Sequence, residues 1–160
     1  MTDKIDSVIA HIMANRAEAV LDGQRHEADR LHDAELRQEE SAVATQAWAD
    51  LKSRIYGFLL DLNAKLEVAR IEVSFDAGSD GNAGLLSEYE AWFSRGSQSV
   101  DHNMRTVFKA RANGQIDIFI AAVGDHAPRA TFEFRIETMS DEDVAEVFVR
   151  FLEVGTKLAA

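Results

Sequence analysis

The chain contains no cysteine and only one proline among its 160 residues. Without cysteine it can form neither disulfide bonds nor cysteine-ligated zinc or iron–sulfur sites, and it cannot use a thiol nucleophile. It also lacks a run of 18 consecutive apolar residues, so no segment is predicted to span a membrane. Residues 1–20 alternate polar with apolar side chains and carry Asp3 and Asp6, unlike a secretory signal peptide. We therefore expect a cytoplasmic protein.

Basic residues are also few relative to acidic ones. The chain has 17 Lys and Arg against 28 Asp and Glu, a formal net charge of −11, and the acidic excess is present in both 1–66 and 67–160. Proteins that bind nucleic acid neutralise phosphates with clustered Lys and Arg, so the charge argues against a nucleic-acid partner. It favours a basic protein as partner, whereas the ordinary alternative is an acidic surface that only keeps the protein in solution.

Helix breakers are rare in residues 1–66. Residues 4–21 place apolar side chains at helical spacing, and Asp22-Gly23 predicts a stop or a kink. Residues 24–66 contain no proline, and Gly57 is their only glycine, so a second helix is expected there. The later part of this helix has one apolar seam: Trp48, Leu51, Ile55, Phe58, Leu59, Leu62 and Leu66.

The length of that second helix bears on association. Residues 24–66 would form a helix about 65 Å long, whereas a compact domain of this size is about 40 Å across. The heptad-like series that runs from Leu31 to Leu66 contains too many polar residues for a stand-alone coiled coil. The helix would suit either a helical hairpin with residues 4–21 or a pairing with a second chain. We favour a homodimer that self-associates through the N-terminal helices, since symmetric pairs are the commonest oligomers.

Residues 67–160 read as strands followed by a helix. Apolar and polar residues alternate over 69–75 and 130–138, as in strands with one wet face, while 85–95 fits either a short helix or a strand. Ser140, followed by acidic residues, predicts the cap of a final helix with an apolar stripe from Val144 to Leu152. The predicted fold is α+β: an N-terminal helical arm or hairpin over 1–66, and over 67–160 an antiparallel sheet of four or five strands with one face covered by helices, plus a C-terminal helix, all one structural domain.

Asn113-Gly114 lies between two alternating runs and predicts a β-hairpin. A two-residue turn would mix charged side chains into the apolar face. A three-residue loop, 112–114 with a bulged glycine, places Arg111 opposite Gln115 and separates the apolar face from the charged one. We adopt this register.

The same register brings two Asp-His dipeptides to the open end of the hairpin. Asp101 would face Asp125, with His102 diagonal to His126. Two imidazoles and two carboxylates together could bind a metal or act as general acid and base near neutral pH. The alternative is that all four are ordinary polar loop residues, which are common in turns.

Three further patterns suggest binding only weakly. His26, Asp29 and Asp33 share one face of a helix and could chelate a divalent ion, although no second ligand set accompanies them, as a metal-binding bundle would need. The glycine-containing loop 76–84 lacks calcium-loop, P-loop and dinucleotide-binding spacing, which favours a mobile connection. An aromatic group could stack on a ligand but is more typical of a core or an interface: Trp48, Tyr89, Trp92 and Phe93.

No catalytic or cofactor motif is present, so we predict no cofactor and a non-enzymatic, acidic protein-binding module: a chaperone, an adaptor or a neutralising partner of a basic protein. The alternative is a small-molecule-binding protein or enzyme with a pocket between sheet and helices and the Asp/His cluster at its rim. A deep cavity under the sheet would favour the alternative, whereas a filled core with exposed apolar surface would favour the binding module.

Overall fold

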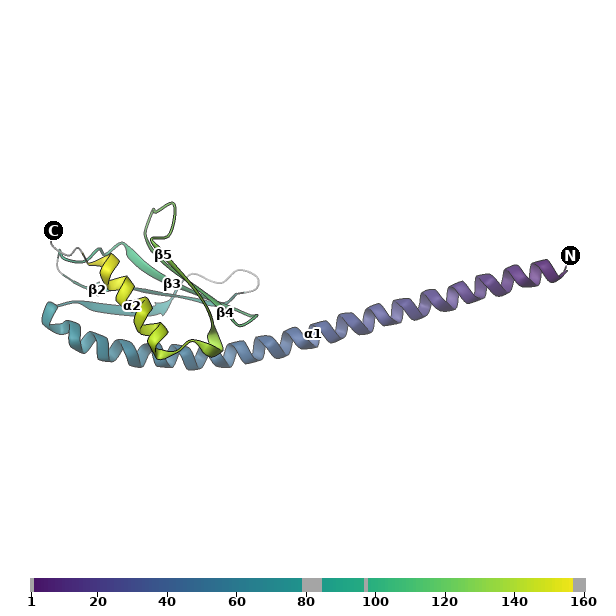
Figure 1. The fold of residues 1–160 in the computed structure, drawn as a ribbon, viewed down its shortest axis with the longest axis horizontal. Coiled ribbons are helices and arrows are strands. Elements are labelled where there is room, and N and C mark those ends of the chain that lie inside the picture. Colours follow the sequence, from purple (N-terminus) through teal and green to yellow (C-terminus); the bar gives the residue numbers. More distant parts are fainter. Residues whose placement is uncertain (1, 79–84, 97, 157–160) are drawn as a thin grey trace. The chain divides into compact units, whose positions relative to one another are not determined.

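The computed structural model describes residues 2–78, 85–96 and 98–156, and the chain consists of two units, 1–39 and 40–160. Helix α1, Thr2–Leu66, runs through the whole of the first unit and into the second (Figure 1). The stop predicted at Asp22-Gly23 is wrong, and α1 is one helix rather than a hairpin. A single interior glycine costs a helix only about 1 kcal/mol relative to alanine, and Leu21, Gln24 and Arg25 beside it are good helix formers.

The first unit, residues 2–39 of α1, is called here the N-terminal helix segment. All of its residues are exposed. The second unit begins at Glu40, shortly before Ala44, the first buried residue of α1. The helix ends at Leu66, where the sequence pattern changes from helical spacing to the alternation of strands.

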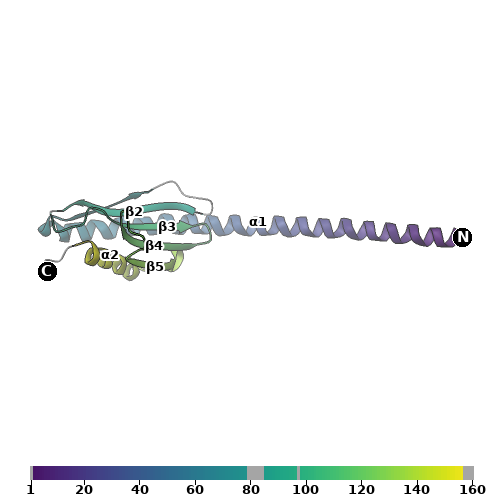
Figure 2. The same cartoon turned by 90° about the horizontal axis from the view of Figure 1, so that it is seen from above.

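The second unit contains a five-stranded sheet in the order β1-β2-β3-β4-β5, with every neighbouring pair antiparallel. Residues 85–95, for which the sequence left two readings, form a strand. Helix α2 follows the sheet, after a short 3₁₀ turn, and Figure 2 shows the same elements from above. The strands are β1 (Glu72–Ala77), β2 (Leu85–Arg95), β3 (Met104–Arg111), β4 (Gln115–Ala122) and β5 (Ala130–Arg135), and the helix is α2 (Asp141–Gly155).

The core lies between one face of the sheet and the two helices that cover it, α1 from its buried seam onward and α2 (Figure 1). The predicted seam of α1 is buried or half-buried throughout, with Ile55 fully buried. Aromatic rings connect the layers: Phe148 of α2 lies 5.6 Å from Phe58 of α1 and 6.0 Å from Phe108 of β3, between ring centroids. The predicted α+β architecture with one helix-covered face is confirmed.

The β3–β4 hairpin has the predicted register. Lys109 pairs with Asp117 and Phe108 with Ile118, which places Arg111 opposite Gln115. Gly114 has a φ of 87°, the left-handed conformation that a bulged glycine supplies without steric cost. The charged face is held by Asp117, whose Oδ2 accepts from Arg111 Nε at 2.6 Å and whose Oδ1 accepts from Gln115 Nε2 at 3.0 Å.

Ser140 caps α2 as predicted. Its hydroxyl accepts from the backbone N–H of Asp143 at 3.2 Å, and its own N–H donates to the Asp143 carboxylate at 2.9 Å, a reciprocal capping box. We expect Ser140→Ala to lower the free energy of unfolding by about 1 kcal/mol. Urea unfolding measures this, with Ser140→Thr as the control that keeps a hydroxyl acceptor. Equal losses in the two variants would contradict the capping role.

Candidate functional site

Asp101 and Asp125 lie beyond the paired residues of the β3–β4 hairpin, so the strand pairing expected to set them opposite each other does not reach them. The strand ladder ends at Met104 and Ala122, and only one more backbone bond follows, from Val123 N to Asn103 O at 3.0 Å. The segment before β3 and the segment after β4 both form turns. The register prediction was correct within the hairpin and could not be extended through these turns.

Asp125 holds its own turn together. Its Oδ2 accepts from the Ala122 backbone N–H at 2.9 Å and from Arg129 Nε at 3.1 Å. The Ala122 N–H first, and then the Arg129 guanidinium, hold the pKa of Asp125 below its usual value, with His126 adding a smaller electrostatic contribution. A carboxyl group whose pKa is lowered by folding stabilises the folded state when ionised, so this stabilisation is lost as the pH falls through that lowered pKa.

Asp101 and His102 organise the other turn. Asp101 Oδ1 accepts from the Asn103 N–H at 2.9 Å, and its backbone N–H donates to Gly155 O at 2.7 Å, which connects the turn to the end of α2. His102 Nδ1 lies 3.3 Å from Phe93 O and Nε2 lies 3.1 Å from Gly96 O, and a carbonyl oxygen can only accept. His126 is exposed. Three of these four residues therefore have local structural contacts.

The weak metal candidates lie in the N-terminal helix segment. His26, Asp29 and Asp33 are exposed. Within the described part of the chain, no three His, Asp or Glu side chains are grouped so that they could hold a metal ion. Of the glycine-containing loop, residues 79–84 lie outside the described residues.

The aromatic candidates divide between the two faces of the sheet. Trp48 meets Tyr89 edge to face at 5.6 Å between ring centroids, and Phe93 stacks on Phe151 at 4.5 Å, both in the core under the helices. Trp92 follows Ala91 on the opposite face of β2, where the guanidinium of Arg105 lies 5.9 Å from its ring. These rings therefore pack within the fold and do not form one ligand-stacking surface.

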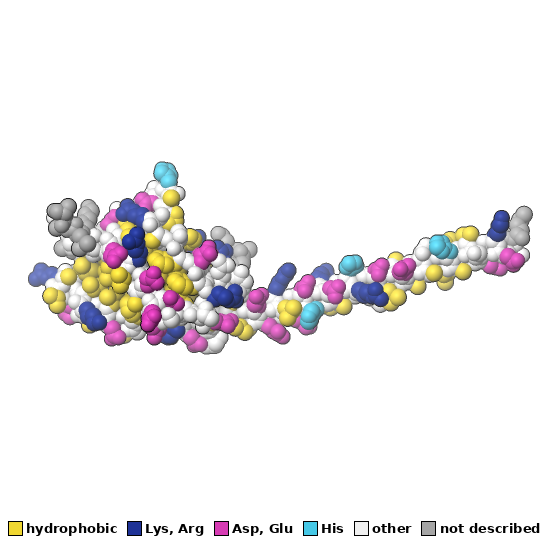
Figure 3. Space-filling view, in the orientation of Figure 1, with side chains coloured by type: hydrophobic (Ala, Val, Ile, Leu, Met, Phe, Trp, Pro, Cys, Tyr) yellow, Lys and Arg dark blue, Asp and Glu magenta, His cyan; other side chains and the backbone are white. Residues whose placement is uncertain are grey.

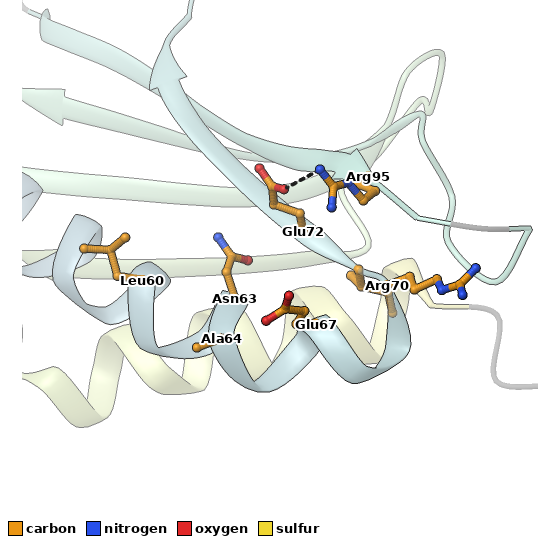
Figure 4. A pocket seen from close by; sticks show the side chains of 8 residues that line it. Leu60, Asn63, Ala64, Glu67, Arg70, Glu72 and Arg95 are labelled. Carbon is orange, nitrogen blue, oxygen red and sulfur yellow. Dashed lines mark ion pairs between the residues drawn. The ribbon is translucent and has the colours of Figure 1, made fainter.

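A surface depression lies where α1 ends beside strand β1. Figure 4 shows its lining, with Glu67 and Arg70 near the end of the helix and Glu72 opposite Arg95 across an ion pair of 3.8 Å. Exposed ion pairs of this length contribute little to stability. The depression carries charged groups of both signs and no convergent set of reactive side chains.

Asn63 also lines this depression (Figure 4), and no pattern in the sequence singled it out. Its Nδ2 donates to Val73 O at 2.9 Å, and its Oδ1 accepts from Val73 N at 2.9 Å. Because β1 is an edge strand, these two bonds occupy polar groups that would otherwise be open to another strand. The only signal in the sequence is an amide next to the apolar Leu62, which by itself is uninformative.

The N-terminal helix segment exposes large apolar side chains to solvent. Its large apolar side chains are about half exposed or more: Ile5 56%, Val8 58%, Ile9 52%, Ile12 51% and Met13 62%. These five residues share one face near the start of α1, because successive residues are rotated by about 100°. Figure 3 shows apolar side chains along the segment between acidic and basic ones.

No family model, no curated protein and no solved structure matches this chain. Among the described helices, none is both long and apolar enough to cross a membrane.

Proposed function

We propose that the protein is a non-enzymatic protein-binding module that self-associates through its N-terminal helix segment. The observation that carries this proposal is the exposed apolar face of that segment, on which Ile5, Ile9 and Ile12 are each more than half exposed. Contiguous exposed apolar surface is characteristic of interaction sites.

The stability of the helix supports the same reading. Most of the stability of helices in proteins comes from packing an apolar face, rather than from intrinsic propensity. The segment has such a face, yet all of its residues are exposed. Pairing with another helix would remove this face from water and stabilise the segment, at about 25 cal/mol for each Å² of apolar surface buried.

The charge of the chain suggests the chemistry of a further partner. With a formal net charge of −11, the protein attracts basic surfaces and repels acidic ones over the range of the electrostatic field. A basic protein is therefore the partner class that we propose beyond self-association, with the protein acting as its chaperone, adaptor or neutralising partner in the cytoplasm.

A small-molecule enzyme is less well supported. Such a function would use a cavity between the sheet and the helices, but Phe108, Ile118 and Phe148 at that position are fully buried and in a packed core. A second depression lies at the surface, between β5 and α2, where Phe132 and Val149 contribute to its lining. Concave, mostly enclosed sites are typical of small-molecule binding, and a filled core does not provide one.

Self-association is tested by light scattering on the purified chain, whose monomer has a mass of 17.8 kDa. We expect twice this mass at micromolar concentration, and a monomer for the double variant Ile9→Asp with Ile12→Asp, because burying unpaired carboxylates is costly. The matched control, Ser7→Asp with Ala10→Asp, adds the same charge at the same spacing on the opposite face and should remain dimeric. A wild-type monomer, or a double variant at Ile9 and Ile12 that stays dimeric, would contradict the proposal.

A further inference from the structure

One row of side chains follows the N-terminal helix segment at a spacing of four, three and four residues. It begins with Ile5, Ile9, Ile12, Arg16, Val20 and Gly23, and continues with the same spacing to Gln38. Eleven residues for three turns correspond to 3.67 residues per turn, so the row stays on one face of α1. Leu21 and Leu36 lie on other faces and are outside the row.

The intervals between the residues of this row are the same whether they are counted from Ile5 or backwards from Gln38. Starting from Gln38 and moving backwards, the spacing meets Ala34, Leu31 and Glu27 at the same intervals at which it meets Ile9, Ile12 and Arg16 from Ile5. A second copy laid antiparallel, with its Gln38 level with Ile5, therefore matches every position of the row. We propose that two copies of this chain pair antiparallel along this row, a proposal that rests on the self-association proposed above.

Charge complementarity selects this arrangement. In the antiparallel register, Arg16 of each copy is level with Glu27 of the other, so the two-fold symmetry produces two opposite-charge pairs. A parallel pair in register would instead set Arg16 against Arg16 and Glu27 against Glu27 near the centre of the interface. Charges of like sign facing each other at an interface are unfavourable and discriminate against that partner orientation.

The glycine in the row fits the same register. A Cβ built on Gly23 would meet nothing within 4 Å, so no contact within the described chain requires glycine at this position. In the antiparallel pair, Gly23 is level with Val20 of the second copy, close to the two-fold axis. A residue without a side chain allows the facing helix to approach there, and Ile12 is likewise level with Leu31, a larger apolar pair.

Glu27 forms an ion pair with a described residue of its own chain, which the test must take into account. Its Oε1 accepts from Arg30 Nη2 at 3.1 Å, and both side chains are well exposed, so this pair contributes little to stability. Substitution of Glu27 removes the pair in the single and in the double variant alike. Recovery in the double variant therefore reports the contact with Arg16 of the second copy.

The test is a charge swap on the full chain, followed by sedimentation velocity. We expect Arg16→Glu alone and Glu27→Arg alone each to raise the dimer dissociation constant about tenfold or more, since each symmetric dimer carries the change twice. The double variant should return close to the wild-type value. The matched controls, Arg25→Glu and Glu18→Arg, make the same charge changes on the opposite face and should leave the dissociation constant unchanged. The antiparallel register is overturned if the single variants leave the dissociation constant unchanged, or if the double variant does not restore it. The proposed self-association would stand in both cases. A wild-type monomer overturns both proposals.

Cross-linking tests the orientation directly, because the natural chain has no cysteine. Under oxidising conditions, a mixture of the Ile12→Cys and Leu31→Cys variants should form the mixed disulfide, and each variant alone should remain largely uncross-linked. Efficient cross-linking of Ile12→Cys with itself would show a parallel pair and overturn the proposal.

Discussion

Replacing Phe148 with alanine is expected to lower the free energy of unfolding of residues 40–160 by about 3–5 kcal/mol. The Phe148 side chain is fully buried, and its ring contacts Phe58 of α1 and Phe108 of β3. Removal of the ring deletes the contacts that join α2 to α1 and to β3, and the neighbouring rings cannot all move into the space. A loss of this size is a large part of the stability of an ordinary domain, which is about 5–15 kcal/mol.

Tryptophan fluorescence during urea unfolding measures this loss. Both tryptophans, Trp48 and Trp92, lie in the second unit, so their signal reports the sheet and its helices rather than the N-terminal helix segment. The control is Val149→Ala, at the next position of α2, where the side chain is 52% exposed and the change should stay within about 0.5 kcal/mol. A Phe148→Ala variant as stable as Val149→Ala would show that the core is not packed around this ring.

Gly155→Ala is expected to destabilise the same unit by about 1–3 kcal/mol through overpacking. A Cβ at Gly155 would clash with Cε2 of Phe93 and lie 2.8 Å from its Cζ. The Phe93 ring is 2% exposed and stacked on Phe151, so it has little room to withdraw. The end of α2 is also fixed, because Gly155 O accepts from Asp101 N.

A second substitution separates this clash from a simple change in helix propensity. Phe93→Leu removes the ring atoms that the new methyl group meets, so the double variant with Gly155→Ala should be less destabilised than the sum of the two single changes. Gly57→Ala is the matched control in α1: a Cβ at Gly57 would meet nothing within 4 Å, and we expect this change to stabilise the unit by up to about 1 kcal/mol. Losses that simply add would show that the Phe93 ring is not what Gly155 accommodates.

The local patterns predicted most of the second unit. Alternation indicated which face of β3 and β4 is buried, and the Asn113-Gly114 turn together with the need to segregate charge led to the correct register. Residues 85–95 could not be assigned because Leu85, Tyr89 and Phe93 fit both periods. This segment is a strand because it pairs with β1 on one side and with β3 on the other. Such pairing depends on distant parts of the chain and cannot be predicted from the segment by itself.

The candidate site was harder to predict than the fold. A cluster of Asp101, His102, Asp125 and His126 required the hairpin ladder to continue about three residues past Met104 and Ala122. Instead, the Asp125 carboxylate accepts the Ala122 N–H and the Asp125 N–H donates to Ala122 O, so this segment forms a turn. Hydrogen bonds from a side chain to nearby backbone groups compete with the hydrogen bonds between strands. The sequence alone does not show which of the two a polar residue at a strand end will favour.

The strand order β1-β2-β3-β4-β5 also has a kinetic meaning. Each strand pairs with the strand next to it in the chain, so every step of sheet assembly closes only a short loop, and the entropy lost in closing a loop grows with its length. Sheets built from such local pairings fold faster than those that join distant strands. The sheet can thus assemble strand by strand in the order in which the chain is made, before α2 closes over its apolar face.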